Sequence, residues 1–341
     1  MGTGQRASSV ARVGHFRTRC VGRLFRGYHS GGVPAPHQRQ CGGTAGSRPR
    51  ARGYDEHMAK LTATALKRIA GLEAFPQPEF LRIRHPVILM HGFGLLAFLA
   101  RGGHLHEEAM HLRLRGVAAF APNVTPYHVI PQRAAMWKER IEVILAQTGA
   151  EKVNLIAHSM GGLDARFLIS NLDMAEQVAS LTTISSPHRG SSLALMALKQ
   201  PENLRELVRT AANWVGENVV EMEADFHAAV ESLTPRAVTN DFNRDVPDVE
   251  GVYYASWAGS AGKGAMNSIN PVFRPFNSWL YGREGINDGF VSVSSAQWGD
   301  YRGEIEADHL QQVGVDVLAG SSFSSKAFLE SLVIDLAKRG F

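Results

Sequence analysis

The sequence predicts an α/β fold built on a mostly parallel, twisted sheet with helices on both faces. Short apolar runs that suit buried strands alternate with helical patterns, which is typical of parallel strands joined by crossover helices. The runs cover residues 87–90, 117–121, 153–157, 181–184 and 252–257. The 341 residues, of which 44% are hydrophobic, are enough to bury a large core, and we find no internal repeat.

A helical stretch interrupts this alternation between residues 191 and 246. It contains helical patterns at 203–219 and 222–233. An inserted helical segment of this kind is typical of a lid or cap over an active site. We therefore interpret it as an amphipathic cover over the serine described below, with ordinary packing helices as the alternative.

Residues 1–54 differ in composition from the rest of the chain. They contain ten arginines, no lysine and no acid, and both cysteines of the chain, Cys20 and Cys41. A segment rich in Gly, Ser, Arg and His without a long apolar run cannot bury a core, so we expect it to be disordered. It has the character of an organellar transit peptide; an upstream extension with Met58 as the true start is the alternative. The folded domain is then residues 55–341.

The positive charge of the chain resides in this basic tail. The whole chain has a formal net charge of +4, but residues 55–341 carry 26 basic and 32 acidic residues, a net charge of −6. An acidic body gives no indication of nucleic-acid binding. We find no run of 18 or more apolar residues, and therefore expect no membrane span. The lack of a secretory apolar region and of cysteines after Cys41 favours an intracellular location.

A serine follows the third apolar run and precedes a helical pattern. Ser159 has Ala157 two residues before it and Gly161 two residues after it. A sharp strand-to-helix turn exposes the serine hydroxyl, but it requires small residues at those two positions. The pattern predicts a nucleophile elbow, and the neighbouring motifs must separate this interpretation from an ordinary turn.

Three histidines follow Ser159, and one of them suits a general base. A serine hydroxyl needs a base to accept its proton and an acid to orient that base. In an α/β enzyme with such an elbow the order along the chain is serine, acid, histidine. His188 comes too early to have the acid before it, and His227 lies in a helical-looking stretch where a surface or packing role is expected. His309 is therefore the predicted base.

The acid must precede His309 on a loop at the carboxyl edge of the sheet. Asp288 lies in a turn-forming Asn-Asp-Gly sequence at a suitable distance from the histidine. Asp308 is adjacent to the histidine and cannot easily reach its ring, and Asp300 lies in a turn where an Asx cap is expected. We assign Asp288 as the acid, with turn capping as the alternative.

The first apolar run ends in a His-Gly-Phe-Gly sequence at residues 91–94. Glycines there allow a loop to bring a backbone N–H towards the serine, and a tetrahedral intermediate needs two preorganised donors for its negative oxygen. We assign these donors to the N–H groups of Phe93 and Met160, and we expect His91 to hold the loop by a hydrogen bond. The residues expected to support the elbow and the loop are His91, Gly92, His158 and Gly161.

These motifs together resemble the bacterial triacylglycerol lipase family of the α/β-hydrolase fold. The resemblance rests on residues 91–93, 158–162, 186–191, 287–291, 294–295 and 309–310. It implies Ser159 as nucleophile, Asp288 as acid and His309 as base, with Phe93 and Met160 at the oxyanion hole. It also implies a lipase-like carboxylic-ester hydrolase that works through an acyl-enzyme, on an acyl ester or lipid, with transient contact to a lipid interface. An acyltransferase on the same triad and a non-catalytic ligand-binding relative are the alternatives.

Two positions depart from the family pattern. Ala157 stands where the family usually has glycine, and Gln311 stands where its calcium-binding members have an aspartate. A neutral amide cannot replace a carboxylate as the charged ligand of a hard cation, and residues 259–278 contain no aspartate to serve as its partner. We therefore expect no calcium site of the family type, no other metal and no cofactor. The loop around His309 must then be held by other contacts, for which Asp308, Gln311 and Gln312 are available.

Overall fold

The computed structural model describes residues 64–72, 74, 80–93, 105–125, 128–199, 219–315 and 322–341. It divides into two units, residues 1–75 and 76–341. In the first unit, residues 64–69 form a short helix. The basic tail at residues 1–54, for which disorder was expected, lies outside the described residues.

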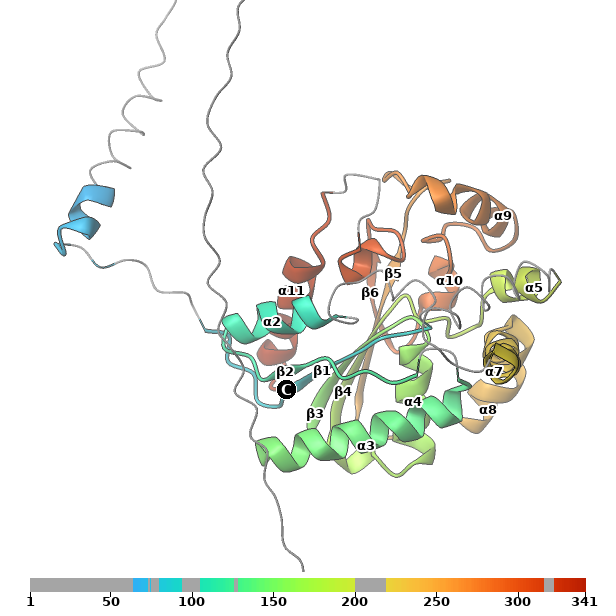
Figure 1. Ribbon diagram of the computed structural model, residues 1–341, viewed down its shortest axis with the longest axis horizontal. Helices are drawn as coiled ribbons and strands as arrows, with labels where there is room; N and C mark the ends of the chain where they lie inside the picture. The colour runs from blue at the N-terminus through green and yellow to red at the C-terminus, as the bar shows by residue number, and fades with distance from the viewer. Residues whose placement is uncertain are drawn as a thin grey trace, which may run out of the picture. The chain divides into compact units, whose positions relative to one another are not determined.

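The second unit is built on one six-stranded sheet with the strand order β2-β1-β3-β4-β5-β6 (Figure 1). The strands are β1 (Val87–Met90), β2 (Ala119–Phe120), β3 (Val153–His158), β4 (Val178–Ile184), β5 (Tyr253–Gly259) and β6 (Asp300–Ile305). Every pair of neighbouring strands is parallel. The predicted parallel sheet is confirmed, and each of the five predicted apolar runs overlaps a strand.

The sixth strand was not predicted from the sequence. Strand β6 lies at the edge of the sheet, and its sequence, Asp-Tyr-Arg-Gly-Glu-Ile, has no apolar run because most of its residues are exposed or half-buried. The expectation that Asp300 caps a turn is wrong. Asp300 is the first residue of β6, and its Oδ2 accepts a hydrogen bond from the hydroxyl of Tyr253 on β5 at 2.7 Å.

Helices cover both faces of the sheet (Figure 1). Helices α2 (His106–Leu114) and α11 (Ser325–Lys338) lie on one face, where Val87 and Leu89 of β1 join their apolar cluster. Helices α3 (Ile130–Thr148) and α4 (Gly161–Asn171) lie on the other face, against Ile88 and Met90. Successive side chains of a strand point to opposite faces, so a strand covered on both sides is mostly apolar. This explains why β1 reads as a continuous apolar run.

The remaining elements lie mainly in the second half of the chain. They are η2 (Ala175–Gln177), α5 (Ser192–Lys199), α7 (Val219–Ser232), the π-helix η3 (Ala237–Phe242), α8 (Asn243–Asp245), η4 (Pro271–Phe273), α9 (Arg274–Glu284), α10 (Val293–Ala296) and η5 (Gln311–Val313). Helix α7 agrees with the helical pattern expected at 222–233, whereas most of the pattern expected at 203–219 lies outside the described residues.

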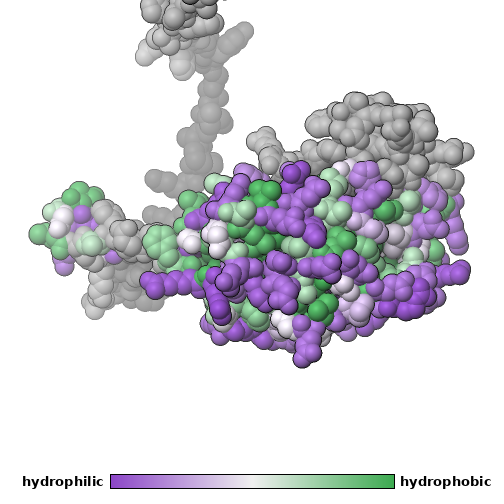
Figure 2. Space-filling view, turned by 90° about the horizontal axis from the view of Figure 1, so that it is seen from below, coloured by the Kyte–Doolittle hydropathy of each residue, from purple (hydrophilic) through white to green (hydrophobic). Residues whose placement is uncertain are grey.

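The outer surface is largely hydrophilic on the side of α3. Figure 2 shows this side with hydrophobic residues scattered among hydrophilic ones. Within the described parts of the chain, we find no helix with the length and apolar character needed to cross a membrane.

The strand order creates a crevice at one end of the sheet. Strand β1 has β2 on one side and β3 on the other, so the connections that follow β1 and β3 leave the sheet in opposite directions. In open α/β sheets ligands bind outside the carboxyl ends of the strands at such a switch point. The loop at residues 91–93 follows β1 and Ser159 follows β3, so both lie at this crevice.

Candidate active site

Ser159 lies at a sharp turn between β3 and α4. Its φ angle is 56°, in the left-handed region, which costs a residue other than glycine about 1–2 kcal/mol. Such strain persists where the surroundings hold the backbone in place. A Cβ added to Gly161 would lie 2.8 Å from the carbonyl oxygen of His91, and one added to Gly162 would clash with Ser186. The small residues around the serine are therefore needed for the turn to pack against the neighbouring loops.

The structure brings Ser159, His309 and Asp288 together from three separate loops. Ser159 Oγ lies 2.9 Å from His309 Nε2, and His309 Nδ1 lies 2.7 Å from Asp288 Oδ2. Asp288 is fully buried between α9 and α10, and His309 follows β6. The three side chains form one continuous line of hydrogen bonds, in the geometry that a serine nucleophile, a base and an orienting acid require.

The carboxylate of Asp288 is held by donors on both oxygens. Oδ1 accepts from the backbone N–H groups of Phe290 at 3.0 Å and Val291 at 2.9 Å. Oδ2 accepts from His309 and from Nε2 of Gln312, the latter at 3.0 Å. Burial alone would raise the pKa of Asp288, but His309 and these backbone N–H groups outweigh it and hold the pKa below its ordinary value. Asp288 is therefore a carboxylate at neutral pH.

Two aromatic rings fix the orientation of the His309 imidazole. The ring of His158 lies 4.4 Å from it and the ring of Phe290 lies 5.1 Å from it, measured between centroids. His158 was expected to support the elbow, and the structure places it against His309 as well. Phe290 comes from the same loop as Asp288, so that loop contacts the imidazole through both its charge and its ring.

Asp308 and Gln311 hold the loop that carries His309. Asp308 Oδ1 accepts from the N–H groups of Leu310 and Gln311, and Oδ2 accepts from the N–H of Asn270 at 3.1 Å. Gln311 Oε1 in turn accepts from the N–H of Asp308 at 3.0 Å. Protein hydrogen bonds thus tie the histidine loop to the segment before η4. Within the described ranges, no group of three or more His, Cys, Asp or Glu side chains is arranged to hold a metal ion.

The loop after β1 passes directly over Ser159. A Cβ added to Gly92 would lie 2.5 Å from Ser159 Cβ and 3.0 Å from the backbone nitrogen of Met160. Only glycine permits this approach. Among the described residues, neither the N–H of Phe93 nor that of Met160 donates a hydrogen bond. Within the described part of the chain, both N–H groups are therefore available beside the serine.

His91 contacts the same loop on its inner side. Its Nδ1 lies 2.9 Å from the carbonyl oxygen of Gly92, and its Nε2 lies 3.2 Å from the backbone nitrogen of Val124. Nδ1 can only donate to a carbonyl and Nε2 can only accept from an N–H, so these contacts assign the proton to Nδ1. The expected role of His91 in holding the loop by a hydrogen bond agrees with this geometry.

A buried arginine that was not predicted controls the direction of the loop. Arg133 of α3 donates to the carbonyl oxygens of His91 at 2.9 Å and Gly92 at 3.3 Å. It also pairs with Asp164 of α4 at 2.8 Å, and both side chains are fully buried. In a trans peptide the C=O and the following N–H point in opposite directions. Because the carbonyl of Gly92 points at Arg133, the N–H of Phe93 points away from it.

Asp164 remains the counter-ion of this arginine at neutral pH. Burial raises its pKa to about 6, against the opposing effects of Arg133 and of the Trp137 N–H. A carboxyl with that pKa is largely ionised at pH 7, so the pair is charged on both sides. A buried pair of this kind becomes costly when one partner is removed, because the other charge is left uncompensated.

A family model described as the alpha/beta hydrolase fold matches residues 35–261 of this sequence. The chain belongs to the α/β-hydrolase fold family. The matched residues include Ser159 and the loop after β1, and they end before Asp288 and His309. The match covers more than half of the chain and agrees with the sheet described above.

Curated relatives and solved structures extend this assignment. The triacylglycerol lipase of Pseudomonas fragi is 29% identical over 272 residues, which cover 67% of this chain and 88% of the relative. Triacylglycerol lipase 2 of Saccharomyces cerevisiae is 29% identical over 250 residues, which cover 67% of this chain and 72% of the relative. A metagenomic carboxyl esterase has the same fold, with a TM-score of 0.61 at 20% identity over 78% of this chain and 80% of the esterase. The chain is a carboxylic-ester hydrolase of the lipase type.

Proposed function

We propose that this hydrolase acts on lipid acyl esters of the triacylglycerol class, with Ser159 as nucleophile, His309 as base and Asp288 as acid. The observation that carries the assignment of residues is the unbroken line of hydrogen bonds from Ser159 Oγ through His309 to Asp288. The substrate class rests on the names of the lipase relatives.

In the first half of the reaction Ser159 Oγ attacks the ester carbonyl carbon while His309 Nε2 accepts its proton. The negative oxygen of the tetrahedral intermediate accepts hydrogen bonds from the N–H groups of Phe93 and Met160. Asp288 holds the imidazole in the productive tautomer and stabilises its positive charge. The alcohol then leaves with the proton from His309, and the acyl group stays on Ser159.

In the second half a water molecule replaces the alcohol. His309 accepts a proton from the water, whose oxygen attacks the acyl carbon, and the intermediate collapses to release the carboxylic acid. The proton returns from His309 to Ser159 Oγ, which restores the enzyme. The reaction needs no cofactor.

Helix α7 acts as the cover over this site in our proposal. The ring of Phe226 on α7 lies 4.9 Å from the ring of Phe93. Ala229 of the same helix packs in one apolar cluster with Met160. Phe93 thus contacts α7, Met160 belongs to the same apolar cluster as this helix, and Ser159 is only 9% exposed. Displacement of this cover at a lipid surface would admit a long acyl ester.

Labelling with a fluorophosphonate tests the nucleophile. The reagent should modify Ser159, located by peptide mass spectrometry, and it should fail to modify the Ser159→Ala variant. Modification of another serine would refute the assignment of Ser159.

Hydrolysis rates across p-nitrophenyl esters of increasing chain length, together with a triacylglycerol emulsion, test the substrate class. We expect rates on long-chain esters to exceed those on acetate and butyrate esters. Activity confined to short esters would overturn the lipid substrate and leave the catalytic residues unaffected.

A further inference from the structure

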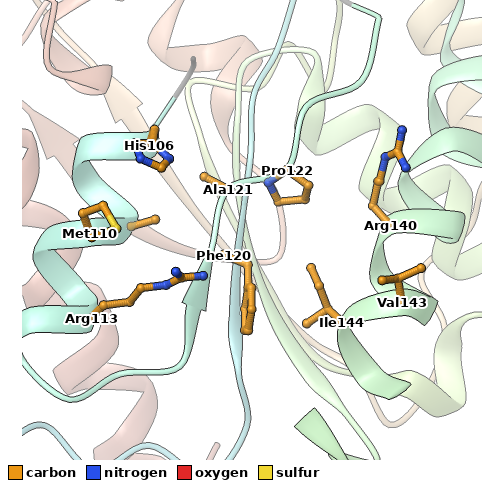
Figure 3. A pocket seen from close by; sticks show the side chains of 10 residues that line it. His106, Met110, Arg113, Phe120, Ala121, Pro122, Arg140, Val143 and Ile144 are labelled. Carbon is orange, nitrogen blue, oxygen red and sulfur yellow. The ribbon is translucent and has the colours of Figure 1, made fainter. Parts of the chain in front are cut away.

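A cavity of about 260 Å³ lies at the open edge of the sheet, where β2 is the last strand (Figure 3). It is bounded by α2 on one side and by α3 on the other, with residues of β2 between them. None of its lining residues contributes to the site around Ser159. The groove is therefore a separate feature of the fold.

The floor of the groove is apolar. Phe120 of β2 and Ile144 of α3 lie next to each other at its centre (Figure 3). Met110 of α2 is 41% exposed and Val143 of α3 is 50% exposed, on opposite walls. Single exposed apolar residues are ordinary on a protein surface, but apolar side chains gathered around a cavity indicate a ligand site.

Positive charge surrounds this apolar floor. Arg113 of α2 and Arg140 of α3 supply this charge; the ring of His106 also lines the groove, and no acidic residue does. None of the three has an acid three or four residues away along its helix, so the usual helical ion pair is absent. Among the described residues no salt bridge engages Arg113 or Arg140, although residues 55–341 carry a net charge of −6. The groove is a local excess of positive charge on an acidic body.

Arg113 is fixed in position for a ligand. Its Nε donates to the carbonyl oxygen of Ala119 at 2.6 Å, and its guanidinium lies 4.9 Å from the centroid of the Phe120 ring. Its two terminal nitrogens have no partner among the described groups. A guanidinium held in this way has already lost most of its side-chain freedom, so it can bind a carboxylate through a preorganised fork of donors.

The same hydrogen bond argues against a peptide strand as the ligand. An edge strand can pair with an added strand only through its free backbone groups. Arg113 occupies the outward carbonyl of Ala119, so the short edge of β2 is blocked at that position. An apolar floor beside a fixed guanidinium instead suits a molecule with an acyl chain and an anionic head.

We propose that this groove binds the anion of a fatty acid, with its carboxylate on Arg113 and its chain across Phe120 towards Ile144 and Val143. Arg140 adds positive potential around the head group. The cavity is slightly smaller than the about 300–1,000 Å³ typical of drug-sized ligands, which fits one acyl chain that remains partly exposed. The hydrolase releases such carboxylates, and the groove does not depend on which residues catalyse that release.

Calorimetric titration with sodium decanoate tests this proposal. The full chain is first inactivated with a long-chain alkyl fluorophosphonate, which fills the site at the catalytic serine, so that binding reports the groove alone. We expect one equivalent of decanoate to bind the inactivated protein, and decanol to bind about tenfold more weakly because it lacks the charge.

Variants then locate the site. Arg113→Gln should weaken decanoate binding about tenfold, and Val143→Asp should abolish it by placing a negative charge beside the acyl chain. Arg82→Gln is the matched control, because Arg82 is also exposed but lies before β1, outside the groove. The esterase rate of each variant before inactivation reports whether it has folded, and Val143→Asp replaces Arg113→Gln if the latter does not fold.

Two results of the titrations would overturn the proposal. One is the absence of saturable decanoate binding to the inactivated wild-type protein. The other is an equal weakening of decanoate binding in Arg82→Gln and Arg113→Gln, because the effect would then arise from the net charge of the protein and not from the groove. A photoreactive fatty acid gives an independent location: cross-links to peptides that contain Met110, Phe120 or Val143 support the groove, and cross-links confined to other peptides refute it.

Discussion

Two buried histidines lie beyond the carboxyl ends of the strands, and their surroundings are opposite in charge. His309 points one nitrogen at the carboxylate of Asp288, 2.7 Å away, and the other at Ser159. His188, which follows β4, lies 3.5 Å from a terminal nitrogen of Arg166 and 3.0 Å from the hydroxyl of Thr183. Both rings are shielded from water, with His188 fully buried and His309 8% exposed.

The comparison shows that the charge of the neighbour decides what a buried imidazole can do. Burial lowers the pKa of His188 far below its ordinary value, and the positive charges of Arg166 and Arg189 lower it further. A carboxylate neighbour, by contrast, stabilises the imidazolium that forms when a base accepts a proton. His309 is therefore suited to proton transfer, and His188 is suited to a permanently neutral role.

His188 instead belongs to a cluster that fixes the end of the helical insertion. Its carbonyl oxygen accepts from Asn243 Nδ2 at 2.8 Å, and Arg166 donates to Asn243 Oδ1 at 2.8 Å and to the carbonyl of Val246 at 2.9 Å. The guanidinium of Arg166 also lies 3.7 Å from the centroid of a ring of Trp298. Burial lowers the pKa of Arg166 to about 10, so it is still charged at neutral pH.

The largest expected effect is a loss of esterase activity when His309 is replaced, but not when His188 is replaced. Ser159→Ala and His309→Ala should each lower kcat/KM on a p-nitrophenyl ester by about 10⁶-fold, as expected for members of a unit that acts together. His188→Gln should lower it less than tenfold, because His188 does not contact the reacting atoms. Circular dichroism must show that all three variants are folded. A near-normal rate in His309→Ala would reverse our assignment of the base.

The second prediction removes the charge that distinguishes His309. Asp288→Asn should lower kcat by about 10⁴-fold, by analogy with the same change in serine proteases, because an amide favours the wrong imidazole tautomer. Asp308→Asn is the control, since the carboxylate of Asp308 accepts only from backbone N–H groups among the described residues. If the two variants lose activity equally, the assignment of Asp288 as the acid that orients His309 is refuted.

The third prediction concerns stability and pH at His188. Below about pH 6.5 the unfolded chain binds a proton at this histidine and the folded chain does not. The free energy of unfolding should therefore fall as the pH is lowered, by about 1.4 kcal/mol per pH unit between pH 6.5 and 5. This slope should be absent from His188→Gln. Urea unfolding of both proteins across that range measures it, and identical slopes would contradict a neutral His188 in the folded state.

A smaller effect is expected at Gln312, which donates to Asp288. Gln312→Leu should lower kcat about tenfold with KM unchanged, because Asp288 loses one of its donors and is held less firmly. Gln312→Glu should be more harmful, since it sets a second carboxylate beside Asp288 and close to Asp308. A purely structural role predicts the opposite order, because glutamate preserves the shape of glutamine.

The smallest expected effect is none at all. Chelation with EDTA should leave the melting temperature and the esterase rate unchanged, because Asp308 and Gln311 hold the His309 loop through hydrogen bonds. A bound ion would stabilise the folded state by mass action. A drop in melting temperature under EDTA that calcium alone restores would show that the inference from Gln311 was wrong.

The sequence predicted those parts of the molecule that follow from local patterns. Strands covered on both faces are largely apolar, so β1 and β3 could be found. The order of serine, acid and histidine selected Asp288 and His309, which the structure brings together with Ser159. Edge strand β6 has no such pattern. It was missed because its residues are mostly exposed or half-buried.

The missed residues of the site are those whose role depends on tertiary contacts. Arg133 lies in a helix where an arginine normally faces water, and its partner Asp164 is 31 positions away. Gln312 was expected only to help hold the loop, and its contact with Asp288 requires the folded positions of two loops. No local spacing encodes these pairs.

The loop over Ser159 is held by a different helix from the one that we propose as its cover. The backbone of residues 91 and 92 is fastened by Arg133 to α3, one of the framework helices. Helix α7, the cover in our proposal, touches this loop through the side chain of Phe93. If α7 moves away as we propose, the ring of Phe226 would leave the entrance, whereas the backbone of residues 91 and 92 would stay in place beside the serine. The loop beside Ser159 would therefore be preorganised before an ester enters the site, and it would not have to form around the substrate.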